Sequence, residues 1–260
     1  SNSSPTITNT IVCGNESDQI FGSWTDGGGV CVAVYCTDSD DDGIIDECDD
    51  EVGDGIHEVP GEFESIQEAV AVANDGDTVL VSPGTYTGTG DWVINLDGKS
   101  ITIRATGGAE ETILDGEGVR GVVQCAGGEG PDTIIEGFTI TGGLYDNGGG
   151  IYCSNNSHPT ITKCTIENNA AKISGGGICC DLSSPTITDC TIDGNTANDE
   201  GGGIFCLYSS PTMTDCMIEG NEAFSGGGLS INSGSNPTLI ATNVCGNDPD
   251  QISGSWSDGG

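Results

Sequence analysis

Basic side chains are scarce in this sequence. Its 260 residues include 5 lysines and arginines against 41 aspartates and glutamates, which gives a formal net charge of −36 at pH 7. Nucleic-acid binding needs a basic surface that neutralises phosphates. The composition therefore excludes a nucleic-acid partner. Anionic polysaccharides would be repelled in the same way unless divalent cations bridge the two surfaces.

Long apolar runs are missing as well. No stretch long enough to cross a bilayer is apolar throughout, so we expect no membrane span. An initiating Met and a signal peptide are also missing, and we expect the sequence to be a processed or excised piece of a longer protein.

Glycine, by contrast, is abundant, with 44 residues, and much of it belongs to a repeat. Between Gly148 and Asn247 one pattern occurs four times: three glycines with an apolar residue, a polar turn, a Pro-Thr-apolar run and an Asn. The prolines lie 26 residues apart, and an Asn follows each after ten residues: Pro159, Pro185, Pro211 and Pro237, then Asn169, Asn195, Asn221 and Asn247. A fixed period in this range indicates a solenoid in which each repeat forms one turn.

The repeat predicts short strands. Segments such as Ile151-Tyr152-Cys153 and Thr160-Ile161-Thr162 alternate and are rich in β-branched residues, and no helical periodicity interrupts them. Equivalent strands of successive turns would run parallel, about 4.8 Å apart. We expect the Asn column to pair its amides along the stack while it takes the left-handed backbone of a tight turn.

At these residues the sequence, GGGIYC…PTITKCTIENN, resembles the right-handed parallel β-helix proteins of pectin-lyase-like fold. The resemblance covers residues 56–260 and implies an all-β, right-handed parallel β-helix solenoid in a secreted or cell-surface protein. It does not imply one function, because this fold hosts lyases, hydrolases, esterases, adhesins and fibre proteins. Less regular strands are expected near residues 101–104, 112–114, 122–124 and 133–140.

One amphipathic helix is predicted at residues 63–73, with Phe63, Ile66 and Val70 on its apolar face. We expect it to cap the N-terminal end of the β-helix, because an exposed solenoid end invites aggregation.

The 13 cysteines include two columns of the repeat: Cys153, Cys180 and Cys206, and Cys164, Cys190 and Cys216. One interpretation is a ladder of small buried thiols. The other is one disulfide per turn, joining Cys153 to Cys164, Cys180 to Cys190 and Cys206 to Cys216. The odd count and the lack of Cys-x-x-Cys spacing favour free thiols, whereas an oxidising compartment would favour disulfides.

Residues 30–55 are strongly acidic, and Asp38–Asp49 matches the spacing of a twelve-residue calcium loop with Gly43 at its bend. We predict that this loop binds Ca²⁺ through the side chains or carbonyls of Asp38, Asp40, Asp42, Ile44, Asp46 and Asp49. The segment resembles the thrombospondin type-3 repeat, and that resemblance implies a disulfide between Cys36 and Cys48. The alternative is a solvated acidic linker.

The two ends of the sequence are alike. Residues 3–28 align with residues 235–260 at an offset of 232, and 17 of the 26 positions are identical. We interpret residues 1–29 as the terminal turn or tail of a preceding β-helix unit, residues 30–55 as a linker and residues 56–260 as the next unit. Alternatively, both ends share a capping motif.

Two charged columns are candidates for catalysis: Lys163, Asp189 and Asp215, and Glu167, Asp193 and Glu219. The second could supply the close carboxylates of acid–base catalysis. Such neighbours repel by about 1 kcal/mol in water, a small cost on a surface, so we expect an exposed ladder; calcium along this column is an intermediate alternative. His57 and His158 have no motif partner and are expected on the surface.

We therefore expect a non-enzymatic, extracellular structural or adhesive module, stiffened by calcium. Its expected partners are copies of itself, joined head to tail in a tandem array or filament, and cell-surface polysaccharide. The alternative is a carbohydrate-active enzyme or a carbohydrate-binding β-helix.

Overall fold

The computed structural model describes residues 6–7, 10–12, 25–26, 30–32 and 55–259, in two units that divide between Asp54 and Gly55. In the first unit, strand β1 (Thr6–Ile7) pairs in parallel with β3 (Thr25–Asp26), and β2 (Thr10–Val12) with β4 (Val30–Val32). The calcium loop Asp38–Asp49 and the Cys36–Cys48 disulfide lie outside the described residues and stay predictions. The division of the chain into residues 1–29, 30–55 and 56–260 also stays a prediction.

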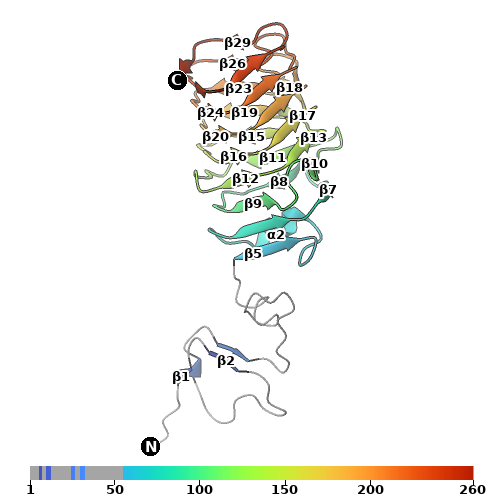
Figure 1. Cartoon of the computed structure of the whole chain (residues 1–260), viewed down its shortest axis with the longest axis vertical. Helices are drawn as coiled ribbons and strands as arrows, with labels where there is room; N and C mark the ends of the chain where they lie inside the picture. Colours follow the sequence, from blue (N-terminus) through green and yellow to red (C-terminus); the bar gives the residue numbers. More distant parts are fainter. Residues whose placement is uncertain (1–5, 8–9, 13–24, 27–29, 33–54, 260) are drawn as a thin grey trace, which may run out of the picture. The chain divides into compact units, whose positions relative to one another are not determined.

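The second unit is the parallel β-helix that the repeat predicts (Figure 1). Each regular turn gives one strand to each of three parallel sheets. The first sheet has nine strands: β5 (Ile56–Val59), β6 (Thr78–Val81), β9 (Thr102–Ala105), β12 (Ile134–Glu136), β16 (Thr160–Thr162), β20 (Thr186–Thr188), β24 (Thr212–Thr214), β27 (Thr238–Ile240) and β30 (Ser257–Asp258).

The second sheet has seven strands: β7 (Gly84–Tyr86), β10 (Thr112–Asp115), β13 (Thr139–Thr141), β17 (Thr165–Glu167), β21 (Thr191–Asp193), β25 (Met217–Glu219) and β28 (Asn243–Cys245). The third also has seven: β8 (Trp92–Asn95), β11 (Gly121–Cys125), β15 (Ile151–Cys153), β19 (Ile178–Asp181), β23 (Ile204–Leu207), β26 (Leu229–Ile231) and β29 (Ile252–Ser253). A small side sheet of three strands, β14 (Leu144–Asn147), β18 (Ala170–Ser174) and β22 (Thr196–Ala197), runs beside them.

The core is a set of apolar columns inside the stack. Strands of the Thr-Ile-Thr type place their central residue inward and both threonines outward, because side chains alternate along a strand. Ile135, Ile161 and Ile187 are register partners in successive turns, and each is at most 1% exposed. Every turn therefore contributes one residue to each column and buries it against its two neighbours.

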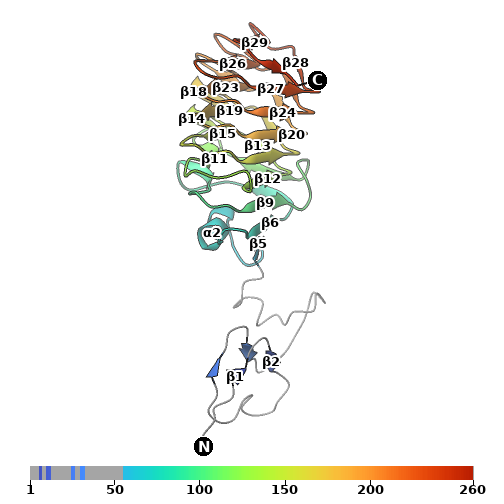
Figure 2. The ribbon, with the colours of Figure 1, turned by 90° about the vertical axis from the view of Figure 1, so that its left-hand side faces the viewer.

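A helix fills the first turn. Strands β5 and β6 pair directly, and helix α2 (Ile66–Val72) connects them where later turns have strands (Figure 2). It is shorter than the predicted 63–73, because Ser65 is the N-cap and forms a capping box with Glu68. Ile66 and Val70 are buried in the core. The helix therefore covers the N-terminal end of the apolar columns, as expected.

Two details of the strand prediction were wrong. The segment near 133–140 is not one strand: Gly137, at φ 81°, separates β12 from β13. The ladder asparagines are not the left-handed residues either. That backbone belongs to the residue before each of them: Asn168, Gly194, Gly220 and Gly246, at φ of 54°, 62°, 64° and 66°.

The Asn column itself is confirmed as a continuous amide ladder. The Nδ2 of Asn169 donates to Oδ1 of Asn195 at 3.0 Å, and the same bond at 3.0 Å joins Asn195 to Asn221 and Asn221 to Asn247. The last amide donates to Oε1 of Gln251 at 2.9 Å. All four asparagines are buried, so the ladder supplies the partners that these amides would otherwise lack.

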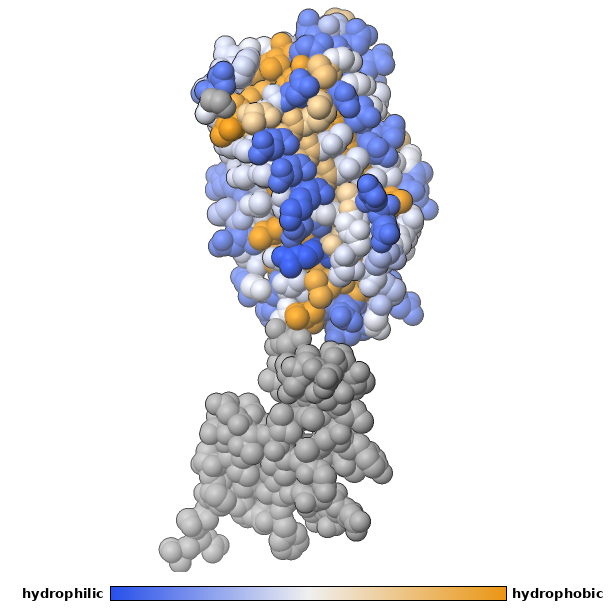
Figure 3. All heavy atoms as spheres, in the orientation of Figure 1, coloured by the Kyte–Doolittle hydropathy of each residue, from blue (hydrophilic) through white to orange (hydrophobic). Residues whose placement is uncertain are grey.

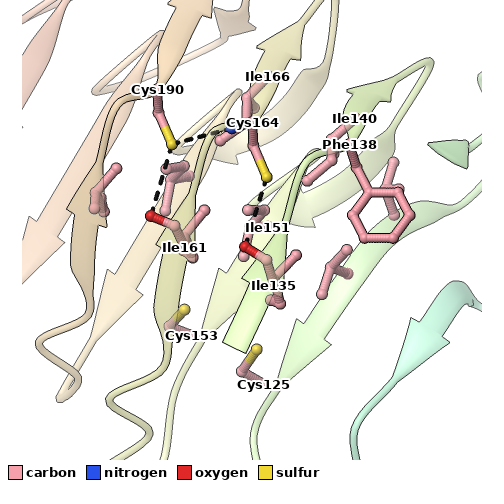
Figure 4. Close-up of a cluster of buried hydrophobic side chains, with 14 of the residues drawn as sticks. Cys125, Ile135, Phe138, Ile140, Ile151, Cys153, Ile161, Cys164, Ile166 and Cys190 are labelled. Atoms are coloured by element: carbon pink, nitrogen blue, oxygen red, sulfur yellow. Dashed lines mark hydrogen bonds between the residues drawn. The ribbon is translucent and has the colours of Figure 1, made fainter. Parts of the chain in front are cut away.

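The cysteine columns are buried thiols without disulfides (Figure 4). Cys125 extends the first column by one turn, in register with Cys153, although it lies outside the regular repeat of the sequence. Sγ of Cys190 lies 3.7 Å from the carbonyl oxygen of Ile161, which belongs to the previous turn. Sγ of Cys164 makes the same contact with the carbonyl oxygen of Ile135. A hydrogen bond to Cys153, together with burial, raises the pKa of the Cys125 thiol. The per-turn disulfide alternative is therefore wrong for this structure.

Candidate functional site

The carboxylates that were candidates for catalysis do form a column. Glu167, Asp193 and Glu219 are register partners at the ends of β17, β21 and β25, and each is half-buried. Among the described residues, no group of three or more His, Cys, Asp or Glu side chains could hold a metal ion. The column thus gathers charge in a line without forming a cage of oxygen ligands.

Each of the five basic side chains is engaged within the chain. Nζ of Lys99 donates to the carbonyl oxygens of Val70, Ala71 and Ala73 at 2.6, 2.7 and 2.7 Å, at the C-terminal end of α2. The others form ion pairs: Arg104 and Lys163 with Glu136, Arg120 with Glu117, and Lys172 with Asp146.

Glu136 lies between two of these cations. Its carboxylate accepts hydrogen bonds from Nζ of Lys163 at 2.8 Å and from Nε of Arg104 at 2.7 Å, across three adjacent turns. Both bonds, the one from Lys163 first, hold the pKa of Glu136 below its usual value. Figure 3 shows that strongly hydrophilic side chains gather in a stripe along the axis, on the face of the β-helix that it draws.

The two histidines are half-buried, and each has a hydrogen-bond partner that no sequence motif indicated. His57 is half-buried, and its Nε2 lies 3.0 Å from Oδ2 of Asp77. The backbone N–H of Asn74, followed by His57, lowers the pKa of Asp77. Nδ1 of His158 accepts a hydrogen bond from the backbone N–H of Ser184 at 2.8 Å. Both histidines therefore tie neighbouring turns together.

A cleft that no sequence motif announced lies between α2 and the outer face of the third sheet. It has a volume of about 730 Å³. Helix α2 and its N-cap contribute Ser65, Gln67 and Glu68, and β8 and β11 contribute Asn95 and Gln124. The segment 87–91 and Tyr145 of β14 complete the wall. Segments that are far apart in sequence thus meet at this end of the stack.

An aromatic cluster forms one side of the cleft. The ring centroids of Trp92 and Tyr145 lie 4.4 Å apart, and the two ring planes are tilted by 47°. The centroids of Trp92 and Tyr152 lie 6.1 Å apart, and those planes are nearly parallel, at 13°. Trp92 is only 8% exposed and packs over Gly121 of the next turn, where a Cβ would collide with the indole. The packed indole fixes the position of the half-buried Tyr145 ring at the cleft.

Some polar side chains that line the cleft form hydrogen bonds within the protein, and others do not. Gln67 bonds both main-chain groups of Asn95: its Oε1 accepts from the N–H at 2.7 Å, and its Nε2 donates to the carbonyl oxygen at 3.2 Å. Gln67 thereby anchors α2 to the edge of β8. Among the described residues, neither the Gln124 side-chain amide nor the Tyr145 hydroxyl has a hydrogen-bond partner. Both are available to a ligand.

The charge of the cleft has one sign. Glu64, Glu68 and Asp91 line it and are exposed, and no Lys or Arg does so. The sequence offered little warning of this site, because its residues follow no spacing rule. The one sequence feature that pointed to the site was Trp92, which is one of three tryptophans. Its register partner in the next turn is a glycine, Gly121.

Comparison with known proteins found similarity to one protein family and to solved structures. A solved structure titled as a crystal structure of pectate lyase Pel9A is similar over 78% of this chain and 67% of that chain, at 15% identity and a TM-score of 0.47. A search of curated proteins found no match. None of the described helices is long and apolar enough to cross a membrane. The model of the family described as "Right handed beta helix region" matches residues 124–255, more than half of the sequence, and the chain belongs to that family.

Proposed function

We propose that this protein binds carbohydrate in the cleft between α2 and the third sheet. The observation that carries the proposal is the Tyr145 ring, held by Trp92 beside the uncommitted amide of Gln124. Ligand sites combine a concave, partly aromatic surface with a few fixed polar groups. Sugars present both complements: C–H groups that suit the electron-rich face of an aromatic ring, and hydroxyls that suit an amide.

The negative charge of the cleft limits which class of sugar can bind there. Glu64, Glu68 and Asp91 would repel a uronic acid, and the cleft has no cation to offset them. Neutral or amino sugars avoid this cost, and their hydroxyl or ammonium groups can donate to the carboxylates. The ligand we propose is therefore a neutral or amino-sugar polymer, such as those of cell surfaces.

The cation contacts support a form of the proposal without lyase chemistry, in which a basic side chain takes a proton and a cation stabilises negative charge. Lys99 is committed to the end of α2, and Arg104, Lys163, Arg120 and Lys172 each pair with a carboxylate. None of these cations lines the cleft as a base or as a stabiliser of developing negative charge.

Titration calorimetry with soluble oligosaccharides tests the proposal. The panel contains neutral glucans, xylans and mannans, amino-sugar oligomers, and uronic-acid oligomers. We expect binding of a neutral or amino-sugar member, weakened about tenfold or more by Tyr145→Ala or Gln124→Ala. Tyr208→Ala is the matched control, because Tyr208 is 58% exposed and lies outside the cleft.

Two results would contradict this function. One is the absence of binding to every neutral and amino-sugar member of the panel. The other is binding that Tyr145→Ala and Tyr208→Ala change equally. Trp92 is not a suitable test position, because removing a buried indole costs about 3–5 kcal/mol of stability and would confound the measurement.

A further inference from the structure

The first sheet presents a regular array of threonines on its outer face. In four successive turns, strands β16, β20, β24 and β27 have the form Thr-x-Thr or Thr-x-Ile, with the central residue buried in the core. Figure 1 shows β16, β20 and β24 stacked one above another. Register pairing places the outward residues in two columns of four: Thr160, Thr186, Thr212 and Thr238, then Thr162, Thr188, Thr214 and Ile240. We call these eight positions the threonine grid.

Most hydroxyls of the threonine grid are not used within the protein. Oγ1 of Thr160 donates to the carbonyl oxygen of Pro131 at 2.9 Å. Within residues 55–259, the hydroxyls of the other six threonines have no hydrogen-bond partner. A threonine hydroxyl can both donate and accept a hydrogen bond. The grid therefore offers a set of free donors and acceptors, each beside a methyl group.

The stacking of turns sets the spacing of these hydroxyls. Adjacent strands lie about 4.8 Å apart, and two residues that flank a third on one strand are about 6.6 Å apart. The pairing keeps one register from β16 to β27, so the hydroxyls repeat in two directions. Water molecules that bridge neighbouring hydroxyls take the same repeat. The grid is therefore suited to an ordered layer of water rather than to one small molecule.

The threonine grid contains neither a charged side chain nor an aromatic ring. The charged residues of the same turns, Lys163, Asp189 and Asp215, lie at the left-handed corner and border the grid. The fold itself does not require uncharged residues on an outer face, because the second sheet carries the carboxylate column that begins at Glu167. The absence of charge from four turns of the first sheet is therefore a property of this face.

We propose that the threonine grid binds the surface of ice. Ice is a neutral solid whose water molecules both donate and accept hydrogen bonds, and along one crystal axis its oxygen atoms repeat at nearly the spacing of parallel strands. A rigid grid with that repeat meets many lattice positions at once, so contacts that are weak singly act together. A sugar polymer is the poorer fit, because sugar sites combine an aromatic surface with a few polar groups, and the grid has no aromatic ring.

Thermal hysteresis of the full chain, observed on a single ice crystal in a cooled droplet, tests the proposal. The wild-type chain should stop growth of the crystal just below its melting point and shape it into facets. Thr188→Lys places a long charged side chain in the middle of the grid and should abolish both effects. Thr191→Lys is the matched control, because Thr191 lies in β21 of the same turn and is half-buried like Thr188. The control changes the net charge equally and should behave like the wild type.

A variant that should gain activity keeps the test independent of damage to the fold. Ile240→Thr fills the one position of the grid that lacks a hydroxyl, and it should widen the hysteresis gap. A wild-type chain without hysteresis, equal losses in Thr188→Lys and Thr191→Lys, or no gain in Ile240→Thr would each overturn the proposal. Sedimentation with crystalline cellulose or chitin completes the test. Retention on either solid that Thr188→Lys abolishes, without any effect on ice, would make the grid a polysaccharide site and also overturn the proposal.

Discussion

One corner of the stack places a left-handed residue in each of four successive turns. Lys163, Asp189, Asp215 and Ala241 have φ of 54°, 53°, 53° and 46°. Aspartate tolerates this conformation, because its short side chain can hydrogen-bond locally, whereas alanine has no such compensation. The repeat thus keeps the backbone shape at Ala241 with a residue that is poorly suited to it.

Ala241→Gly should raise the free energy of unfolding by about 1 kcal/mol, because glycine adopts a positive φ without a Cβ clash. Thermal unfolding would show this as a higher midpoint. The control is Ala170→Gly in β18, a strand position without positive φ. That change should lower the free energy of unfolding by about 0.5–1 kcal/mol. A loss of stability in both variants would contradict the strain at Ala241.

At this scale the sequence predicted columns better than backbone angles. A period of 26 residues was enough to place Asn169 above Asn195 and to predict their amide bond, because stacking turns align equal positions. The left-handed residue before each ladder Asn was assigned wrongly although the repeat carries a signal for it. Gly194, Gly220 and Gly246 hold that position in three turns, and glycine adopts a positive φ more readily than Asn. The partner of His158 was missed because the bond runs to a backbone N–H, which no side-chain motif records.

Helix α2 is the element that departs from the repeat, and hydrogen bonds hold it at three places. Ser65 and Glu68 close its first turn, Gln67 bonds the main chain of β8, and Lys99 bonds its last carbonyls. A helix of seven residues has little stability of its own. Its position therefore depends on these bonds and on its buried face.

Lys99→Met should lower the free energy of unfolding by roughly 1–3 kcal/mol, because three carbonyl oxygens at the helix end lose a charged donor. Chemical denaturation measures the effect. Lys172→Met is the matched control: Lys172 is 59% exposed and bonds an exposed Asp146, so its removal should change little. Equal effects of the two substitutions would show that Lys99 does not hold the helix.

The presence of this helix was predictable, but the cleft beside it was not. The apolar spacing of Ile66, Ala69 and Val70 indicated its buried face directly. The cleft depends on how α2, segment 87–91 and Tyr145 meet, and those segments are related only through the fold. The cleft that we propose for carbohydrate is therefore visible only in the structure, whereas the β-helix could be predicted from the repeat.

For the whole molecule, the largest unbalanced quantity is charge. The acidic residues between 38 and 49 add to the repulsion within each chain, and a bound cation would offset it locally. The calcium loop remains a prediction from the spacing of Asp38, Asp40, Asp42, Ile44, Asp46 and Asp49.

Calcium should protect the segment Asp38–Asp49 from proteolysis, because ligand binding stabilises the folded loop relative to open forms. Limited proteolysis followed by mass mapping, with calcium or with a chelator, would locate the cuts. The variant Asp40→Asn/Asp42→Asn should be cleaved in calcium as fast as the wild type is in chelator. Cleavage of the wild-type loop at the same rate in both conditions would contradict calcium binding by this loop.

The stacking of turns also fixes how the β-helix responds to force. Hydrogen bonds between successive strands lie across the strands, which is along the axis of the stack. A pull between the two ends of the β-helix loads the turn-to-turn contacts in series, so every contact carries the full tension and the weakest one breaks first. Under tension the turns should peel away singly, each release lengthening the chain by about one repeat, whereas compression and bending are shared among all three sheets.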